Sequence, residues 1–357
     1  MSRICLVCVS LRAGGTERVV SRVANHLARA HQVTVVTLSA TQPFYPLERS
    51  VQLVKPAFGS RSGEGLTWYV RLFRYLRHAF SEIRPDLVLS FGEPIAPLVL
   101  PLSRLSKARV LVFNRASPLT SLRGVRGWLN PIFYPLARGV VVQTPASVEL
   151  MRQRYRASRF YVLANPMDIP SEVEPFSRRD HKIINVGTVG GRKNQQGLIR
   201  AFASLRRDQR WSLDLVGDGP DRSKLEALVH DLGLVDRVRF LGQRDDVERL
   251  LQQARIFAFS SLTEGFPNAL AEALAAGCAC LSFDCPTGPA DLIEDGVNGL
   301  LVPNGDQAAF QAALDRLIND GELQERLGRK ARERIQEFDQ SRVLEKLDEL
   351  IESTLAA

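Results

Sequence analysis

The stretch EGFPNALAEALAAG, from Glu264 to Gly277, places two carboxylates around the start of an expected helix. Pro267 suits the first helical position, because the N–H that proline lacks would be unpaired there. Glu264 then lies in the loop before the helix, and Glu272 lies inside it, ~8 Å further along the axis. The helix start itself favours anions. An anionic centre flanked by hydroxyl groups fits this layout, and a nucleotide diphosphate-sugar has that chemistry.

A second interpretation of the two glutamates stays open at this point. Acidic residues are common near helix N-termini because they interact favourably with the helix dipole. The pair alone therefore does not separate ligand binding from helix stabilisation, and the surrounding elements have to be considered.

The two halves of the chain show one repeated pattern. Residues 3–38 and 182–220 each predict a strand, a glycine loop, a helix and a second strand. Continuous apolar strands that alternate with amphipathic helices indicate parallel sheets covered on both faces. Further strands are expected at 86–91, 108–113, 139–144, 160–165, 238–242, 256–261, 279–283 and 299–303.

These elements predict an α/β protein with two doubly wound, Rossmann-like domains, at residues 1–170 and 171–335. Their ligand crevices would lie at the carboxyl ends of the strands, and one cleft would result if those ends face each other. Residues 336–357 are amphipathic. They are expected to form a helix that either ends the second domain or packs back on the first.

Charge is unevenly distributed along the 357 residues. Residues 1–170 hold 23 Lys and Arg against 8 Asp and Glu, a net charge of +15, whereas the whole chain carries +8. A basic half suggests an anionic partner, either nucleic acid or a membrane surface. Because aromatic interleaving and a nucleic-acid reading module are missing, lipid phosphate is the better explanation.

The cysteines and the apolar runs indicate where in the cell the protein is expected. Five cysteines lie in apolar, strand-like stretches, which predicts buried, reduced thiols and a cytoplasmic location. The group Cys278, Cys280 and Cys285 is a poor match to structural zinc sites. No apolar run is long enough to span a membrane, so any membrane association is expected to be peripheral.

The run INVGTVGGRKNQQGLIRAF, followed by LVGDGPDRSKLEALVHDLGLVDRVRFLG and SSLTEGFPNALAEALAAGCACLSFDCPTGP, resembles the family 4 retaining glycosyltransferases of the GT-B fold. The first half matches more loosely, through GGTERVVSRVANHLA and FNRASP. The CPTGP and NRASP stretches are similar to the bacterial subgroup that extends lipid-linked or surface-polysaccharide oligosaccharides.

The resemblance implies roles for named residues. Glu264 would bond hydroxyls of the donor sugar, Glu272 would accept from the ribose hydroxyls, and Lys193 would contact the diphosphate. Backbone groups would contact the donor from Gly14 and Gly15 in the first half and from Gly217, Gly242, Gly265, Phe266, Pro267 and Asn268 in the second.

One departure from the family pattern concerns phosphate charge. The family usually carries an arginine directly after the strand glycine, here Gly187, and this chain has Thr188. Arg192, next to Lys193, is the candidate that takes over part of that charge. The chain also has no Asp-x-Asp pair, so we expect a metal-independent reaction in which cations and a helix dipole stabilise the leaving diphosphate.

The acceptor side carries fewer signals. Asn114 and Arg115 follow an expected strand and are candidates to hold an acceptor phosphate, although a surface arginine is an equal alternative. The family's usual acid is missing from that stretch.

Together these features predict a retaining hexosyl or N-acetylhexosaminyl transferase. It would use a UDP-sugar donor, no cofactor and a lipid-linked or polysaccharide acceptor at an anionic membrane surface. The alternatives are a soluble transferase with a small free acceptor and a catalytically inactive nucleotide-sugar-binding homologue.

Overall fold

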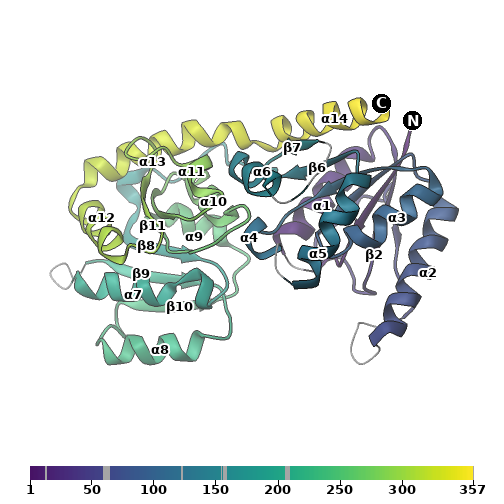
Figure 1. Cartoon of the computed structure of the whole chain (residues 1–357). Helices are drawn as coiled ribbons and strands as arrows, with labels where there is room; N and C mark the ends of the chain where they lie inside the picture. The colour runs from purple at the N-terminus through teal and green to yellow at the C-terminus, as the bar shows by residue number, and fades with distance from the viewer. Residues whose placement is uncertain are drawn as a thin grey trace. The chain divides into compact units, whose positions relative to one another are not determined.

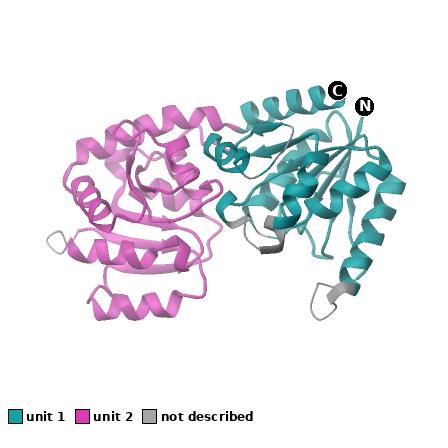
Figure 2. Cartoon of the chain, viewed as in Figure 1, with its two compact units in different colours: residues 1–166, 340–357 teal, residues 167–339 magenta. Residues whose placement is uncertain are grey.

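The computed structural model describes residues 1–12, 14–58, 65–121, 124–153, 155, 159–205 and 210–356. The chain divides into two compact units (Figure 2). Unit 1 holds residues 1–166 together with residues 340–357, and unit 2 holds residues 167–339.

Unit 1 is built on a parallel sheet. Among the described residues it has seven strands in the order β3-β2-β1-β4-β5-β6-β7. They are β1 (Arg3–Cys8), β2 (Gln32–Thr37), β3 (Gln52–Val54), β4 (Leu87–Phe91), β5 (Arg109–Phe113), β6 (Gly139–Val142) and β7 (Phe160–Val162). Because all neighbours are parallel, their carboxyl ends share one edge of the sheet and their amino ends share the other.

Helices cover both faces of this sheet (Figure 1). One apolar cluster joins the strands to α1 (Gly15–Leu27) and α14 (Gln340–Ala356). A second cluster on the strands includes α2 (Gly65–Ile83), α3 (Ala96–Ser106) and α6 (Pro145–Arg152). The short helices α4 (Pro118–Ser121) and α5 (Gly124–Phe133) and the 3-10 turn η1 (Tyr134–Leu136) complete the unit.

The terminal helix α14 belongs to unit 1. Its buried side chains Val343, Leu347 and Ile351 lie in the same cluster as Val20 and Val23 of α1. The amphipathic stretch that leads into α14 is not one continuous helix. Helix α13 (Gly321–Ile335) ends first and is followed by the 3-10 turn η4 (Gln336–Phe338). The chain therefore passes between units at 166/167 and 339/340, against the expected 170/171 and 335/336.

Unit 2 also has a parallel sheet. Its described strands run in the order β10-β9-β8-β11-β12-β13. They are β8 (Asp180–Val186), β9 (Ser212–Val216), β10 (Val238–Gly242), β11 (Ala254–Phe259), β12 (Ala279–Asp284) and β13 (Leu300–Pro303). The prediction of two parallel-sheet α/β domains is thus confirmed.

Two sets of helices cover this second sheet. The main apolar cluster includes α7 (Gln195–Ser204), α8 (Arg222–Asp231), α12 (Gln307–Asn319) and α13. Helices α9 (Val247–Gln253) and α10 (Asn268–Ala275) pack against each other and on β11. The 3-10 turns η2 (Phe176–Arg178) and η3 (Gly191–Lys193) and the short helix α11 (Pro289–Leu292) complete the unit.

Each sheet has one point where the strand order reverses. In unit 1 it lies between β1 and β4, and in unit 2 between β8 and β11. Open α/β sheets bind ligands beyond the carboxyl ends of the strands at such points. The residues that follow these four strands are therefore the first place to look for a site.

The five cysteines are free and buried. Burial raises the pKa of Cys278 to about 12, and burial together with the charge of Glu17 raises that of Cys8 to about 12. These thiols therefore stay protonated at neutral pH. Of the helices in the described part of the chain, none is long and apolar enough to cross a membrane.

Candidate active site

Lys193 and Glu264 form an ion pair at the point where the strand order of unit 2 reverses. Lys193 ends η3, which follows β8, and Glu264 lies in the loop that follows β11. Lys193 Nζ lies 2.6 Å from Glu264 Oε1. The two side chains are 26% and 13% exposed, so the pair is largely shielded from water and still reachable from it.

Hydrogen bonds to backbone carbonyls hold the two loops of this ion pair together. Ser260 Oγ donates to the carbonyl of Lys193 at 2.7 Å, and the N–H of Leu262 donates to the carbonyl of Arg192 at 2.9 Å. Lys193 Nζ also lies 5.4 Å from the centre of the Phe259 ring, within the range of cation–π attraction. The loop after β8 is therefore fixed on the loop after β11, which positions the ammonium group.

The loop after β12 holds the backbone of Glu264. Thr287 Oγ1 donates to the carbonyl of Glu264. Gly288 follows with φ +102, and a Cβ at this position would collide with the ring of Pro267. Glycine is therefore required here, because it alone combines this backbone conformation with such a close approach to the start of α10.

Helix α10 begins one residue later than expected. Asn268 is its first residue and Pro267 precedes it, while the helix ends at Ala275, two residues before Gly277 at φ +76. Pro267 has no N–H, and the N–H of Asn268 donates to the carbonyl of Phe266 at 3.0 Å. Within the predicted donor-binding segment, Gly265 and Phe266 are therefore better placed to offer an N–H to a ligand than Pro267 and Asn268.

Glu272 lies in α10, four residues after Asn268, and is partly buried. The structure therefore places one glutamate before α10 and the other inside it, as the spacing predicted. At 1.5 Å per residue, Glu272 is about 6 Å along the axis from the first residue of the helix.

The remaining predicted donor residues follow neighbouring strands. Thr188 is exposed just after β8, and its carbonyl accepts from Gln195 Nε2 at 3.0 Å. Gly217 follows β9 with φ +124, and its N–H donates to the carbonyl of Gly242 at 2.7 Å. A Cβ on Gly217 would collide with the carbonyl of Gly187. These residues all lie at the carboxyl edge of the sheet.

Arg192 is exposed beside the ion pair. The part of the chain that the structure describes shows no ion pair for it, so its charge is available to a ligand. Its side chain starts from η3 and not from the position of Thr188, which directly follows Gly187.

In unit 1, Gly14 and Gly15 lie at the start of α1. Gly14 is the residue before the helix, and Gly15 is its first residue. The carboxylate of Glu17 folds back over this helix start, because a Cβ on Gly14 would collide with its Oε2. Ser10 Oγ also donates to Glu17 Oε1 at 3.3 Å. The glycine loop was predicted to bring backbone groups at this helix start close to the donor. The start of α1 thus already carries an anionic side chain, that of Glu17.

Arg115 is held inside unit 1 and is not the surface arginine of the alternative interpretation. Its Nη1 donates to the carbonyl of Leu163 at 3.2 Å and to Asn165 Oδ1 at 3.0 Å. Its guanidinium lies over the ring of Phe113 at 5.0 Å. Burial lowers the pKa of Arg115 to about 9, against the opposing charge of Glu93, so the group remains a cation at neutral pH.

Glu93 is a residue that the sequence analysis missed. It is buried and follows β4, and its Oε1 accepts from the N–H of Arg115 at 3.1 Å and from the N–H of Ala116 at 3.0 Å. Asn114, also predicted, is buried beside them and donates through Nδ2 to Met151 Sδ at 3.5 Å. An acid that follows the neighbouring strand thus holds the backbone of the Asn114–Arg115 segment, and its position two residues after the buried strand β4 was the available signal.

The described residues contain no group of three or more His, Cys, Asp or Glu side chains that could hold a metal ion. The charged side chains predicted for the donor site are those of Lys193, Arg192 and the two glutamates, and those of Asp221 and Arg222 lie near Gly190 and Gly242 at the same edge.

Two parallel-sheet α/β units with charged groups at the carboxyl edges of their sheets are the architecture of the GT-B glycosyltransferases. Residues 169–334 match the family model "Glycosyl transferases group 1", and residues 13–170 match "Glycosyltransferase Family 4". Since the two matches together cover most of the chain, it belongs to the family 4 glycosyltransferases of the GT-B fold.

Three similar proteins illustrate this membership. The chain is 26% identical to a GalNAc-alpha-(1->4)-GalNAc-alpha-(1->3)-diNAcBac-PP-undecaprenol alpha-1,4-N-acetyl-D-galactosaminyltransferase of Campylobacter jejuni, over 98% of each chain. It is 26% identical to the amylovoran biosynthesis glycosyltransferase AmsD of Erwinia amylovora, over 95% of this chain and 96% of that protein. The crystal structure of Anabaena HepE in complex with UDP and glucose shares the fold with a TM-score of 0.81 and 20% identity, over 99% of this chain and 100% of HepE.

Proposed function

We propose that this glycosyltransferase moves a hexose or N-acetylhexosamine from a UDP-sugar to a hydroxyl of a lipid-linked or polysaccharide acceptor, with retention of configuration. The observation that carries the proposal is the ion pair between Lys193 and Glu264 at the strand-order reversal of unit 2.

The pair suits a donor that has an anionic centre next to hydroxyl groups. A lysine ammonium has three N–H donors, and one of them is directed at Glu264. The other two remain for oxygens of a diphosphate. Glu264 would use its second oxygen to accept from a sugar hydroxyl, so one ion pair would contact both parts of the donor at the bond that breaks.

Bond cleavage leaves negative charge on the departing diphosphate. Lys193, the exposed Arg192 and the positive end of α10 are the groups of unit 2 that would stabilise it. The acceptor hydroxyl would attack from the face that the diphosphate leaves, without a covalent enzyme intermediate. The resemblance to retaining glycosyltransferases supports this course of the reaction.

The relatives favour the donor and acceptor classes. The Campylobacter relative is named for transfer to a diphospho-undecaprenol-linked glycan, and the Erwinia relative for amylovoran biosynthesis. The HepE crystal structure contains UDP and glucose. In unit 1, Arg115, Asn114 and Glu93 at the carboxyl edge are the proposed acceptor side.

The proposal extends to an anionic membrane, because unit 1 exposes apolar and basic side chains on the helices that pack on α3. On α2, Val70 is 51% exposed beside the exposed Arg74 and Arg77, and on α5, Trp128 is 79% and Ile132 66% exposed. Basic residues near an anionic leaflet contribute about 1 kcal/mol each. Arg123 and the side chain of Arg126, which the sequence analysis would add to this surface, lie outside the described residues.

The experiment that tests the donor assignment compares two lysines. Thermal unfolding is followed with UDP, a panel of UDP-sugars and other nucleotides, since a ligand that binds the folded state raises the melting temperature. Lys193→Met should abolish the shift. Lys330→Met is the matched control, because Lys330 Nζ also lies 2.6 Å from a glutamate, Glu333, on the exposed surface of α13. Equal shifts in both variants would contradict the assignment.

A catalytically inactive nucleotide-sugar-binding protein is the second candidate. The observation in its favour is Thr188, exposed where the family usually carries an arginine. Donor turnover separates the two candidates, because a binding protein would show the thermal shift and leave the UDP-sugar intact.

A further inference from the structure

Three neighbouring strands of unit 1 begin beside an arginine. Arg109 is the first residue of β5, Arg138 directly precedes β6, and Arg159 directly precedes β7. These strands are adjacent in the sheet, and neighbouring strands lie about 4.8 Å apart. The three arginines therefore form a row along the amino edge of the sheet, opposite to the carboxyl edge that carries Arg115.

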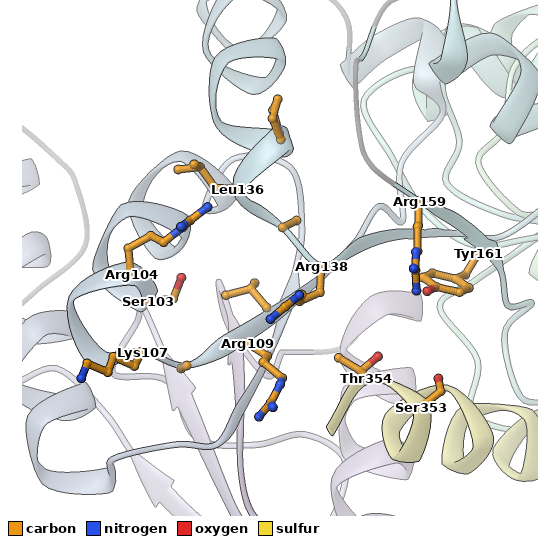
Figure 3. A pocket seen from close by; sticks show the side chains of 14 residues that line it. Ser103, Arg104, Lys107, Arg109, Leu136, Arg138, Arg159, Tyr161, Ser353 and Thr354 are labelled. Carbon is orange, nitrogen blue, oxygen red and sulfur yellow. The ribbon is translucent and has the colours of Figure 1, made fainter. Parts of the chain in front are cut away.

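The row lines a cavity of about 610 Å³ (Figure 3). Arg104 and Lys107, near the end of α3, add two more cations, and α14 adds the hydroxyl groups of Ser353 and Thr354. Among the described residues that line this cavity, none is acidic: they are Ser103, Arg104, Lys107, Ala108, Arg109, Val110, Pro135, Leu136, Ala137, Arg138, Arg159, Tyr161, Ser353 and Thr354.

The acidic residue nearby at this edge is already paired. Asp86 precedes β4, and its carboxylate bonds the side chain of Arg3 at 3.1 Å. Hydrogen bonds from Arg3 lower the pKa of Asp86, with a smaller contribution from Arg109. No ion pair within the described residues involves Arg104, Lys107, Arg138 or Arg159. Arg109 Nε is buried and has no hydrogen-bond partner among those residues.

Local structure explains two of the five cations that line the cavity and leaves the three arginines at the strand starts unexplained. Arg104 and Lys107 lie at the C-terminal end of α3, where positive charge is favourable. The arginines at the starts of β5, β6 and β7 have no such helix end. Like charges that line one cavity repel one another, and a bound anion would offset this repulsion.

We propose that this cavity binds a phosphate-bearing anion. The arginine guanidinium is always charged, and its planar fork bonds two phosphate oxygens at once. A cavity of this volume is within the usual range for small-molecule ligands. The site differs from the proposed donor site, because it is formed entirely by unit 1 and lies at the amino edge of its sheet.

The test measures phosphate binding in two matched double variants of the full chain. Both are made in a Lys193→Met background, so that the proposed donor site does not contribute. Arg138→Gln/Arg159→Gln removes two cations of the cavity. Arg29→Gln/Arg152→Gln removes two exposed cations elsewhere in unit 1 and changes the net charge equally. All four side chains are exposed, so both variants are expected to fold.

Calorimetry with pyrophosphate and with inorganic phosphate tests a free ligand, and co-sedimentation with phosphatidylglycerol against phosphatidylcholine vesicles tests a lipid headgroup. We expect at least a tenfold loss of affinity in Arg138→Gln/Arg159→Gln, in whichever arm shows binding, and less than a twofold loss in the control. Equal losses in the two variants, or no binding of any phosphate probe to the Lys193→Met parent, would overturn the proposal.

Discussion

Lys193 Nζ and Glu264 Oε1 lie 2.6 Å apart, and the same distance separates Lys330 Nζ from Glu333 Oε2 on α13. The two pairs differ in exposure: the side chains are 26% and 13% exposed in the first pair and 43% and 54% in the second. Surrounding water screens the second pair more strongly, so the same geometry should have different energetic consequences.

A double-mutant cycle tests this difference. Lys193→Met with Glu264→Gln should give a coupling of about 1–3 kcal/mol in the free energy of unfolding, because each single change leaves a shielded charge or polar group without its partner. Lys330→Met with Glu333→Gln should give about 0.2–0.5 kcal/mol. Urea unfolding measures both cycles. Couplings of equal size would contradict the view that the first pair is the stronger one.

Thr188 and Arg192 give a second prediction. If Arg192 supplies the phosphate charge that the family places after the strand glycine, Arg192→Ala should weaken UDP-sugar binding by about 1–2 kcal/mol, or roughly tenfold. Thr188→Arg alone should change little, and it should partly rescue Arg192→Ala. Titration calorimetry of the three variants measures this. No loss in Arg192→Ala would show that Lys193 suffices.

The buried thiols give a prediction for stability against pH. Burial raises the pKa of Cys278 and of Cys285 to about 12, whereas a thiol in the unfolded chain titrates near 8.5. The folded state therefore keeps protons that the unfolded chain loses as the pH rises above about 9. The free energy of unfolding should fall there, by up to about 1.4 kcal/mol per pH unit for each thiol.

Urea unfolding between pH 8 and pH 10.5 measures this slope, and Cys278→Ala should reduce it. Thiol labelling at pH 8 should be slow in the folded chain and rapid in urea. Rapid labelling of the folded chain would argue against this burial.

The exposed surfaces of α2 and α5 give a prediction for membranes. The chain should sediment with vesicles that contain anionic lipid and less so at high salt, because charge attraction is screened. Arg74→Gln/Arg77→Gln should weaken this binding. Trp128→Ser should weaken it independently of salt, while UDP binding by unit 2 persists in both variants. Equal binding to neutral vesicles, or none to anionic ones, would favour the soluble acceptor.

Much of the fold could be predicted because the strands of both sheets are buried on two faces. Such strands form nearly continuous apolar runs with a helix between most pairs, and β1, β4, β5 and β6 follow this pattern. The three-residue strand β3 was missed, since a short, half-exposed edge strand has no such run. The amphipathic pattern of α14 showed that it needs an apolar partner, whereas the choice of α1 and the first sheet depends on long-range packing.

The candidate site was predictable where it depends on local sequence. Glu264, Pro267 and Glu272 lie on one segment, so their order around a helix start follows from spacing. The direct contact between Lys193 and Glu264 joins residues 71 positions apart, and strand order alone brings them together. Glu93 was missed for the same reason, since its partner Arg115 follows the next strand of the sheet.

Transfer from a UDP-sugar, followed by NMR, tests the central claim most directly. The chain is incubated with each UDP-sugar of the panel and a diphospho-polyprenol-linked glycan, with and without a chelator, and the anomeric proton of the product is observed. The account predicts release of UDP, an α-linked product from an α-linked donor, and activity that survives chelation. Glu264→Ala should lower the rate roughly 10–100-fold, Glu272→Ala less, and Glu333→Ala not at all. A β-linked product, complete loss on chelation, or a near-normal rate in Glu264→Ala would contradict it.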